Sequence, residues 1–167
     1  MSGGTRTRTR TRWLNAEQQR AWRAYVIGTT LLLDRLDRDL RQAHDISLDE
    51  YEILVRLAES PNRRMRMAIL ADAMCHSRSR ITHTVGRMER AHWVIRNPSP
   101  DDGRGVDAVL TDAGHELLVE AAPVHVEGVR RHLVELADAG ELGSVGALFN
   151  RVADALMPDH PKAIDIR

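Results

Sequence analysis

The chain has 167 residues, and its 24 basic and 24 acidic side chains give a formal net charge of zero. This length suits one domain with a core of its own, and no apolar run approaches the roughly 20 residues of a membrane span. The N-terminus lacks a secretory apolar segment, and a single cysteine excludes an internal disulfide framework. We therefore expect a protein of the reducing cytoplasm, without a membrane partner.

Residues 1–12 form a basic tail in which threonine alternates with four arginines, Arg6, Arg8, Arg10 and Arg12. The alternation has no apolar face to bury, so we predict that this tail is disordered.

Two helices are predicted next. Apolar side chains follow the helical period from Glu17 to about Ala43, which gives a helix of about seven turns. A second helix is expected from Asp49 to Glu59, ended by Ser60 and the proline after it.

Residues 67–90 read as two short amphipathic helices joined by a tight turn. In the second helix Ile81, Val85 and Met88 recur at helical spacing and form one narrow stripe that a neighbouring helix can bury. Ser77 is placed to cap this helix. The opposite face is polar and cationic, and side chains of this kind contact bases and phosphates in the DNA major groove. The alternative is an ordinary solvated face.

A β-hairpin is predicted after these helices. Trp93 to Ile95 are β-prone, two prolines end the run, and strand character resumes from Val106 to Leu110. Arg104 lies near the tip, where an arginine is suited to a narrow minor groove. The alternative is an ordinary surface hairpin. The charges agree with DNA binding, because residues 63–104 hold nine basic and four acidic side chains whereas residues 105–167 hold five and eleven.

Two further helices complete the chain. One is capped by Thr111 and carries Pro123 inside it, which should kink or interrupt it. The last covers residues 141–157 with a long apolar face. The terminal helices carry more apolar surface than a small monomer needs.

The order of helices, hairpin and closing helix resembles the MarR family (multiple antibiotic resistance regulators) of bacterial transcription factors, over roughly residues 20–157. The matching runs are ILADAM, SRSRITHTVGRME, VIR and DDGRGVDAVLTDAGHELL. The resemblance implies a mainly α fold with a small β-hairpin wing, a winged helix-turn-helix over residues 45–110. Residues 13–44 and 111–167 would supply long helices for dimerisation. His92 departs from the family, since many relatives have glycine there to permit a left-handed helix end.

The resemblance also implies functions for particular residues. The second helix would contact bases or phosphates through Ser77, Arg78, Ser79, Arg80, Thr82, His83 and Arg87. In the wing, Arg104 would enter the minor groove and Asp102 would orient it. The expected protein is a homodimeric regulator on the nucleoid, a repressor rather than an activator, that binds pseudo-palindromic double-stranded DNA.

An effector is less well defined by the sequence. Many relatives release DNA when a small phenolic or anionic molecule binds, and Trp22, Arg23 and Tyr25 are candidates to line its cleft. We favour the other interpretation, in which the two aromatic rings pack in the dimer core. Similarly, the basic tail is either an arm that contacts DNA or, as we favour, a tail with weak non-specific attraction.

Other functions receive little support. Cys75 lies where a thiolate could sense oxidants, but we favour a small buried structural residue. His44, His115, His125 and His132 lack strong metal-ligand spacing, so neither a metal nor a cofactor is expected. The chain has no phosphate-binding glycine loop, nucleophile elbow or carboxylate pair, which argues against an enzyme. A protein-interaction module that kept this fold without binding DNA stays open.

Overall fold

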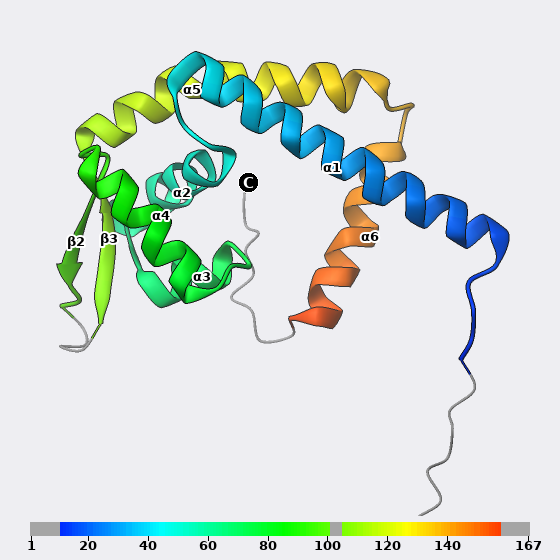
Figure 1. The fold of residues 1–167 in the computed structure, drawn as a ribbon, viewed down its shortest axis with the longest axis horizontal. Coiled ribbons are helices and arrows are strands. Elements are labelled where there is room, and N and C mark those ends of the chain that lie inside the picture. Colours follow the sequence, from blue (N-terminus) through cyan, green and yellow to red (C-terminus); the bar gives the residue numbers. More distant parts are fainter. Residues whose placement is uncertain (1–10, 101–104, 158–167) are drawn as a thin grey trace, which may run out of the picture.

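The computed structural model describes residues 11–100 and 105–157, and these residues form a mainly helical protein with one small sheet (Figure 1). In chain order the elements are α1 (Ala16–His44), α2 (Leu48–Glu59), η1 (Pro61–Arg63), β1 (Arg64–Arg66), α3 (Met67–Ala73), α4 (Arg78–Arg90), β2 (Val94–Pro98), β3 (Val106–Leu110), α5 (Asp112–His132), η2 (Val134–Leu136) and α6 (Glu141–Leu156). The predicted fold class is confirmed. Within the described ranges, no helix combines the length and apolarity needed to cross a membrane.

The main core lies between α2, α3, α4 and the sheet. The predicted stripe of α4 is its central contribution, because Ile81, Val85 and Met88 are all essentially buried. They meet apolar side chains of the neighbouring elements, namely Ile53, Leu54, Leu57, Leu70, Ala71, Val94, Ala108 and Leu110. Burial of one face of α4 leaves the opposite face to solvent.

The sheet has three antiparallel strands in the order β1-β3-β2. Strand β2 pairs with β3 over its whole length, as the predicted hairpin requires, and Val94 lies opposite Leu110. Strand β1 was not predicted. It has only three residues, so its Arg-Met-Arg alternation is too short to predict a strand, and it forms because β3 offers a free edge.

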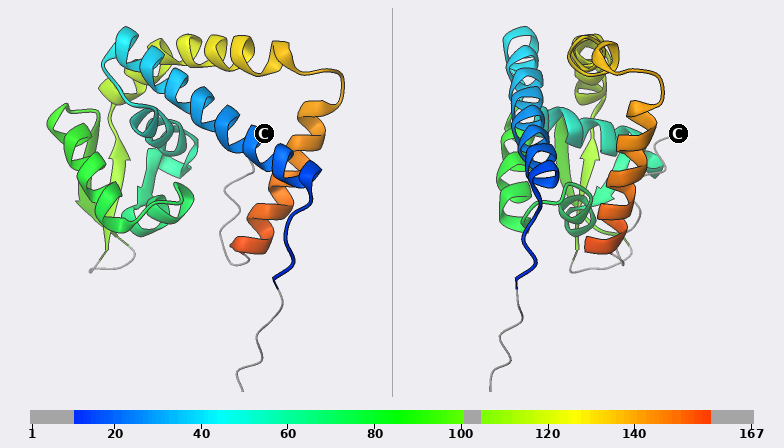
Figure 2. Two further views of the ribbon diagram at one scale, coloured as in Figure 1. Left: turned by 45° about the vertical axis from the view of Figure 1, so that its right-hand side comes forward. Right: turned by 90° about the vertical axis from the view of Figure 1, so that its right-hand side faces the viewer.

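A second core cluster joins the long helices to this unit. Leu40 of α1, Tyr51 of α2 and Ala121 of α5 pack together with Ile46. Figure 2 shows α1 and α5 running over one side of the unit formed by α2, α3, α4 and the sheet, while α6 lies apart from it. Every residue of α6 is at least partly exposed, including Val145 and Leu148 of its apolar face.

Pro123 does not interrupt α5, which runs from Asp112 to His132 as one helix, so that part of the prediction was wrong. Proline removes one backbone donor, the partner of the Val119 carbonyl one turn earlier. Val119 is 60% exposed, and water can replace the missing donor at such a position.

His92 occupies the left-handed backbone region with φ of 63°, although it is not glycine. The turn between α4 and β2 therefore keeps the geometry that glycine supports in relatives. The hydroxyl of Thr111 donates to the His92 carbonyl at 2.7 Å, which helps to hold this conformation.

Candidate nucleic-acid interface

Helix α4 begins where the sequence predicts. Ser77 is its N-cap, and the hydroxyl oxygen accepts a hydrogen bond from the Arg80 amide at 3.3 Å. The cap uses the Arg80 amide, whereas the amides of Arg78 and Ser79 make no hydrogen bond within the described residues and remain as donors for an anion. All seven residues predicted to contact DNA on this helix are exposed, and they are Ser77, Arg78, Ser79, Arg80, Thr82, His83 and Arg87.

The side chains of Arg78 and His83 are free to bind a ligand, because neither makes a hydrogen bond within residues 11–100 and 105–157. The Thr82 hydroxyl donates to the Arg78 carbonyl at 2.8 Å and keeps an oxygen that can accept. The solvent face of α4 therefore offers a mixture of donors and acceptors, the combination that base edges and phosphates require.

Arg80 and Arg87 differ from these residues, because both are bound to carboxylates of α2. The Arg80 Nη2 lies 2.6 Å from Asp49 Oδ2. Arg87 holds Glu50 at two points, with Nε 2.7 Å from Oε1 and Nη2 2.5 Å from Oε2. Two of the cations that sequence reasoning assigned to DNA are therefore paired inside the protein.

Glu50 has a local function as well. Its carboxylate accepts hydrogen bonds from the Ser47 amide and hydroxyl at 2.8 and 2.9 Å, which completes the capping box of α2. The side chain is only 1% exposed, so the charge of Arg87 is needed to balance it. Sequence reasoning missed both acidic residues. The Ser-x-x-Glu pattern at residues 47–50 signals the cap, but nothing local signals a partner 37 residues away.

Asp49 of α2 contacts both α4 and the turn that joins α3 to α4. Its second oxygen lies 3.4 Å from the Nε2 of His76. Burial raises the pKa of the Asp49 carboxyl, but the hydrogen bonds from Arg80 and His76 outweigh this and hold the pKa below its usual range. The carboxylate therefore stays charged at neutral pH and ties both groups to α2.

The wing is connected to α4 by Glu89. This carboxylate receives the Arg96 Nε and Nη2 at 2.9 and 2.5 Å and the Arg96 backbone amide at 3.2 Å. Arg96 lies on β2, so the ion pair fixes the angle between helix and hairpin. Asp102 and Arg104, the predicted wing residues, lie outside the described residues, and their contacts with DNA stay a prediction.

The three residues predicted to line an effector cleft lie in the N-terminal half of α1. Trp22 and Tyr25 are 57% and 40% exposed, and the Tyr25 ring stacks on Phe149 of α6 with centroids 4.8 Å apart. Arg23 is also exposed. The contact of Tyr25 with α6 lies within one protomer, so the placement of these rings in the dimer core stays a prediction.

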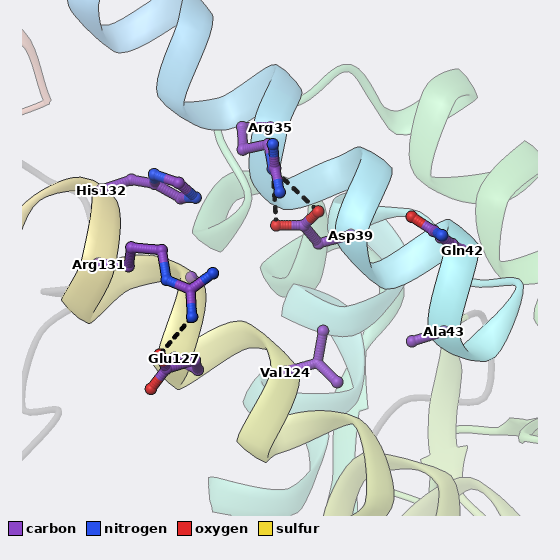
Figure 3. Close-up of a pocket in the computed structure, with 9 residues that line it drawn as sticks. Arg35, Asp39, Gln42, Ala43, Val124, Glu127, Arg131 and His132 are labelled. Atoms are coloured by element: carbon purple, nitrogen blue, oxygen red, sulfur yellow. Dashed lines mark hydrogen bonds and ion pairs between the residues drawn. The ribbon is translucent and has the colours of Figure 1, made fainter.

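A polar pocket of about 510 Å³ lies elsewhere, between the C-terminal halves of α1 and α5 (Figure 3). Arg35 pairs with Asp39 on one wall, and Arg131 pairs with Glu127 on the other. Gly128 lets the helices approach, since a Cβ there would lie 2.7 Å from the Leu36 side chain. Trp22, Arg23 and Tyr25 do not line this pocket.

Two predictions on reactive side chains can be compared with the structure. Cys75 is exposed, so the expectation of a buried residue was wrong. It occupies a turn with φ of 52°, and this conformation points the thiol outward, 3.8 Å from the sulfur of Met157. Among the described residues, no three His, Cys, Asp or Glu side chains form a group that could hold a metal. His125 instead stacks on Tyr51 at 4.5 Å.

Comparison with known proteins agrees with this geometry. The MarR family model matches residues 46–106. The chain is 42% identical to a MarR family transcriptional regulator from Streptomyces coelicolor whose crystal structure is a complex with DNA. The TM-score is 0.85, and the match covers 89% of this chain and 97% of that one. AbsC, another MarR family regulator from this organism, is 40% identical with a TM-score of 0.83, over 89% and 100% of the two chains.

A third relative is the transcriptional regulator PecS of Dickeya dadantii (strain 3937). It is 31% identical in an alignment of 143 residues that covers 79% of this chain and 82% of PecS.

Proposed function

The chain belongs to the MarR family of transcriptional regulators, a family of non-enzymatic proteins, and from this premise we propose that it binds double-stranded DNA as a homodimer and represses transcription. The observation that carries the proposal is the exposed face of α4, where Arg78 and His83 have no partner among the described residues. The relative of 42% identity was crystallised with DNA, which supports the same interface here. The proposal puts the protein on the nucleoid in the cytoplasm.

The residues on the solvent face of α4 should contribute in two ways. Arg78 and His83, which make no hydrogen bond within residues 11–100 and 105–157, are free to reach base edges and phosphates, and the exposed hydroxyls of Ser77, Ser79 and Thr82 lie beside them. Arg80 and Arg87 reach the DNA only with the part of each guanidinium that their α2 carboxylates leave free. We keep Arg104 as the minor-groove residue of the wing and Asp102 as its partner.

Dimerisation is supported by the apolar surface of the long helices. Leu31 of α1 is 62% exposed and Leu148 of α6 is 48% exposed, and α6 buries no residue against its own protomer. Contiguous apolar surface of this kind marks an association surface. In a two-fold dimer the recognition helices would enter successive major grooves, about 34 Å apart. A monomer in light scattering at micromolar concentration would contradict this part of the proposal.

The effector is proposed as an anion held between α1 and α5. The pocket in Figure 3 offers His132 and those N–H groups of Arg35 and Arg131 that their partners Asp39 and Glu127 leave free. Tyr25 instead packs on Phe149 of α6, and Trp22 packs on Tyr25. A thermal-shift screen of aromatic carboxylates tests this. Arg131→Gln should abolish a ligand-dependent rise in Tm that Trp22→Ala retains. If Trp22→Ala abolishes the rise and Arg131→Gln retains it, the effector binds at the N-terminal half of α1 instead.

The experiment that tests the main proposal is selection of genomic fragments by the purified protein, followed by salt titration of the best site. We expect a palindromic consensus, nanomolar affinity and a steep loss of binding with salt. Arg104→Ala should weaken binding to all sequences. If no sequence is enriched, the protein-interaction alternative replaces the regulator.

A further inference from the structure

We infer that Asp49 and Glu50, which lie on α2 away from the exposed face of α4, are positioning residues that set the DNA sequence preference of the protein. The inference rests on the proposed function, since it concerns how α4 reads DNA. The two carboxylates fix Arg80 and Arg87, so that α4 meets the groove with two of its four arginines already oriented. Discrimination between the operator and other DNA then depends on residues that do not touch the DNA.

The geometry of Arg87 is the first observation. A guanidinium carries five N–H donors in a rigid plane. Glu50 takes Nε and one N–H of Nη2, and Ser47 Oγ lies 3.3 Å from Nη2. Nη1 has no partner in the part of the chain that the structure describes, and 47% of the side chain is exposed. One edge of the guanidinium is therefore held while the other remains available.

The rigidity of the support is the second observation. Glu50 is bound within its own capping box, so it cannot follow Arg87 if that side chain moves. The start of α2 is itself fixed to α1, because the Leu48 amide donates to Asp37 Oδ1 at 2.8 Å. A continuous set of hydrogen bonds and ion pairs therefore connects α1, through α2, to α4. Since α1 is the proposed dimerisation helix, these contacts also relate α4 to the dimer axis.

The charge of the carboxylates makes the inference testable. Each one neutralises an arginine that would otherwise attract any phosphate, so it should lower affinity for random DNA. By holding the guanidinium, it should raise affinity for the correct sequence, because less freedom is lost on binding. Removal of one carboxylate should therefore move specific and non-specific affinity in opposite directions. A residue that only stabilises the fold would lower both.

Glu50→Gln is the central variant, because glutamine can still accept the hydrogen bonds of the capping box. The readout is the ratio of Kd for random duplex to Kd for the selected operator, measured over a series of salt concentrations. We expect the ratio to fall about tenfold, the range of one well-made base contact. Binding to random duplex should tighten, with a steeper salt dependence. Glu59→Gln, an exposed residue at the other end of α2, makes the same charge change and should leave the ratio unaltered.

Arg87→Lys separates geometry from charge. Lysine keeps the charge but cannot form the planar two-point pair, so the ratio should fall without a change in salt dependence. The double variant with Arg87→Lys and Glu50→Gln should then have a ratio less than twofold below that of Arg87→Lys alone. Asp49→Asn, which acts through Arg80, tests the same inference if Glu50→Gln does not fold, as judged by circular dichroism.

The outcomes are distinguishable. If the wild type enriches no DNA sequence, the proposed function fails. If the wild type enriches an operator but Glu50→Gln and Asp49→Asn keep the wild-type ratio, the positioning inference is overturned. The inference is equally overturned if Glu50→Gln lowers the ratio as much in the Arg87→Lys protein as it does in the wild type.

Discussion

Gly114 lies in the first turn of α5 and packs against the start of the hairpin, and its replacement by alanine should destabilise the protein. A Cβ at this position would lie 2.2 Å from the carbonyl oxygen of Trp93 and 2.8 Å from the Leu110 side chain. The Trp93 oxygen is backbone and already accepts from the Thr111 amide and hydroxyl, at 3.1 and 3.0 Å. The neighbour therefore cannot rotate away, and α5 must move from the sheet by about 1 Å to reach ordinary van der Waals distance.

The size of the effect follows from three contributions. Overpacking at a site that cannot relax costs about 1–3 kcal/mol. Weakening the Thr111 cap adds about 1 kcal/mol. The higher helix propensity of alanine offsets this loss by up to about 1 kcal/mol. The expected net loss of unfolding free energy is about 2 kcal/mol, or a fall in Tm of about 4–8 °C for a chain of this size.

Differential scanning fluorimetry at one fixed protein concentration measures this change, since the Tm of a dimer depends on concentration. Gly86→Ala is the matched control. It lies in α4 with nothing within 4 Å of a built Cβ, so the same substitution should raise Tm by a few degrees. A Gly114→Ala protein with the Tm of the wild type, or above it, would refute the steric argument.

Three further predictions concern individual side chains. The hydrogen bond from Arg96 holds the pKa of Glu89 below its usual range, so the contribution of this ion pair to stability is present above about pH 4.5 and is lost as pH falls further. Glu89→Gln should speed amide hydrogen exchange over residues 94–97 at pH 7, and unchanged exchange would count against the ion pair. Burial lowers the pKa of His125, so the folded state loses stability as pH falls below about 6.5, where the unfolded chain takes up the proton first. His125→Phe keeps a ring against Tyr51 and should lose less stability between pH 7 and 5.5 in urea denaturation; equal losses in the two proteins would show that His125 is not the cause. His92→Gly should raise stability by up to about 1 kcal/mol, because glycine adopts the left-handed conformation without a steric penalty, and a lower Tm would contradict this.

Sequence alone determined the features that depend on local periodicity and capping. The stripe of Ile81, Val85 and Met88 predicts which face of α4 is buried, because burial of an amphipathic helix follows its 3.6-residue repeat. Ser77 predicts the start of the helix, since a cap acts within four residues. The hairpin strands β2 and β3 were also predictable, because their β-prone runs flank a turn.

Only the tertiary structure decided the features that join distant segments. Strand β1 exists because β3 offers it an edge, and a run of three residues is too short to predict a strand. The exposure of Cys75 depends on the conformation of a turn rather than on its residue type. The pairing of Arg87 with Glu50 joins positions 37 residues apart, and it converts a cation that looks free in the sequence into a fixed one. The charge on a helix face can be read from neighbouring residues in the sequence, but the partner that neutralises it depends on how the helices pack.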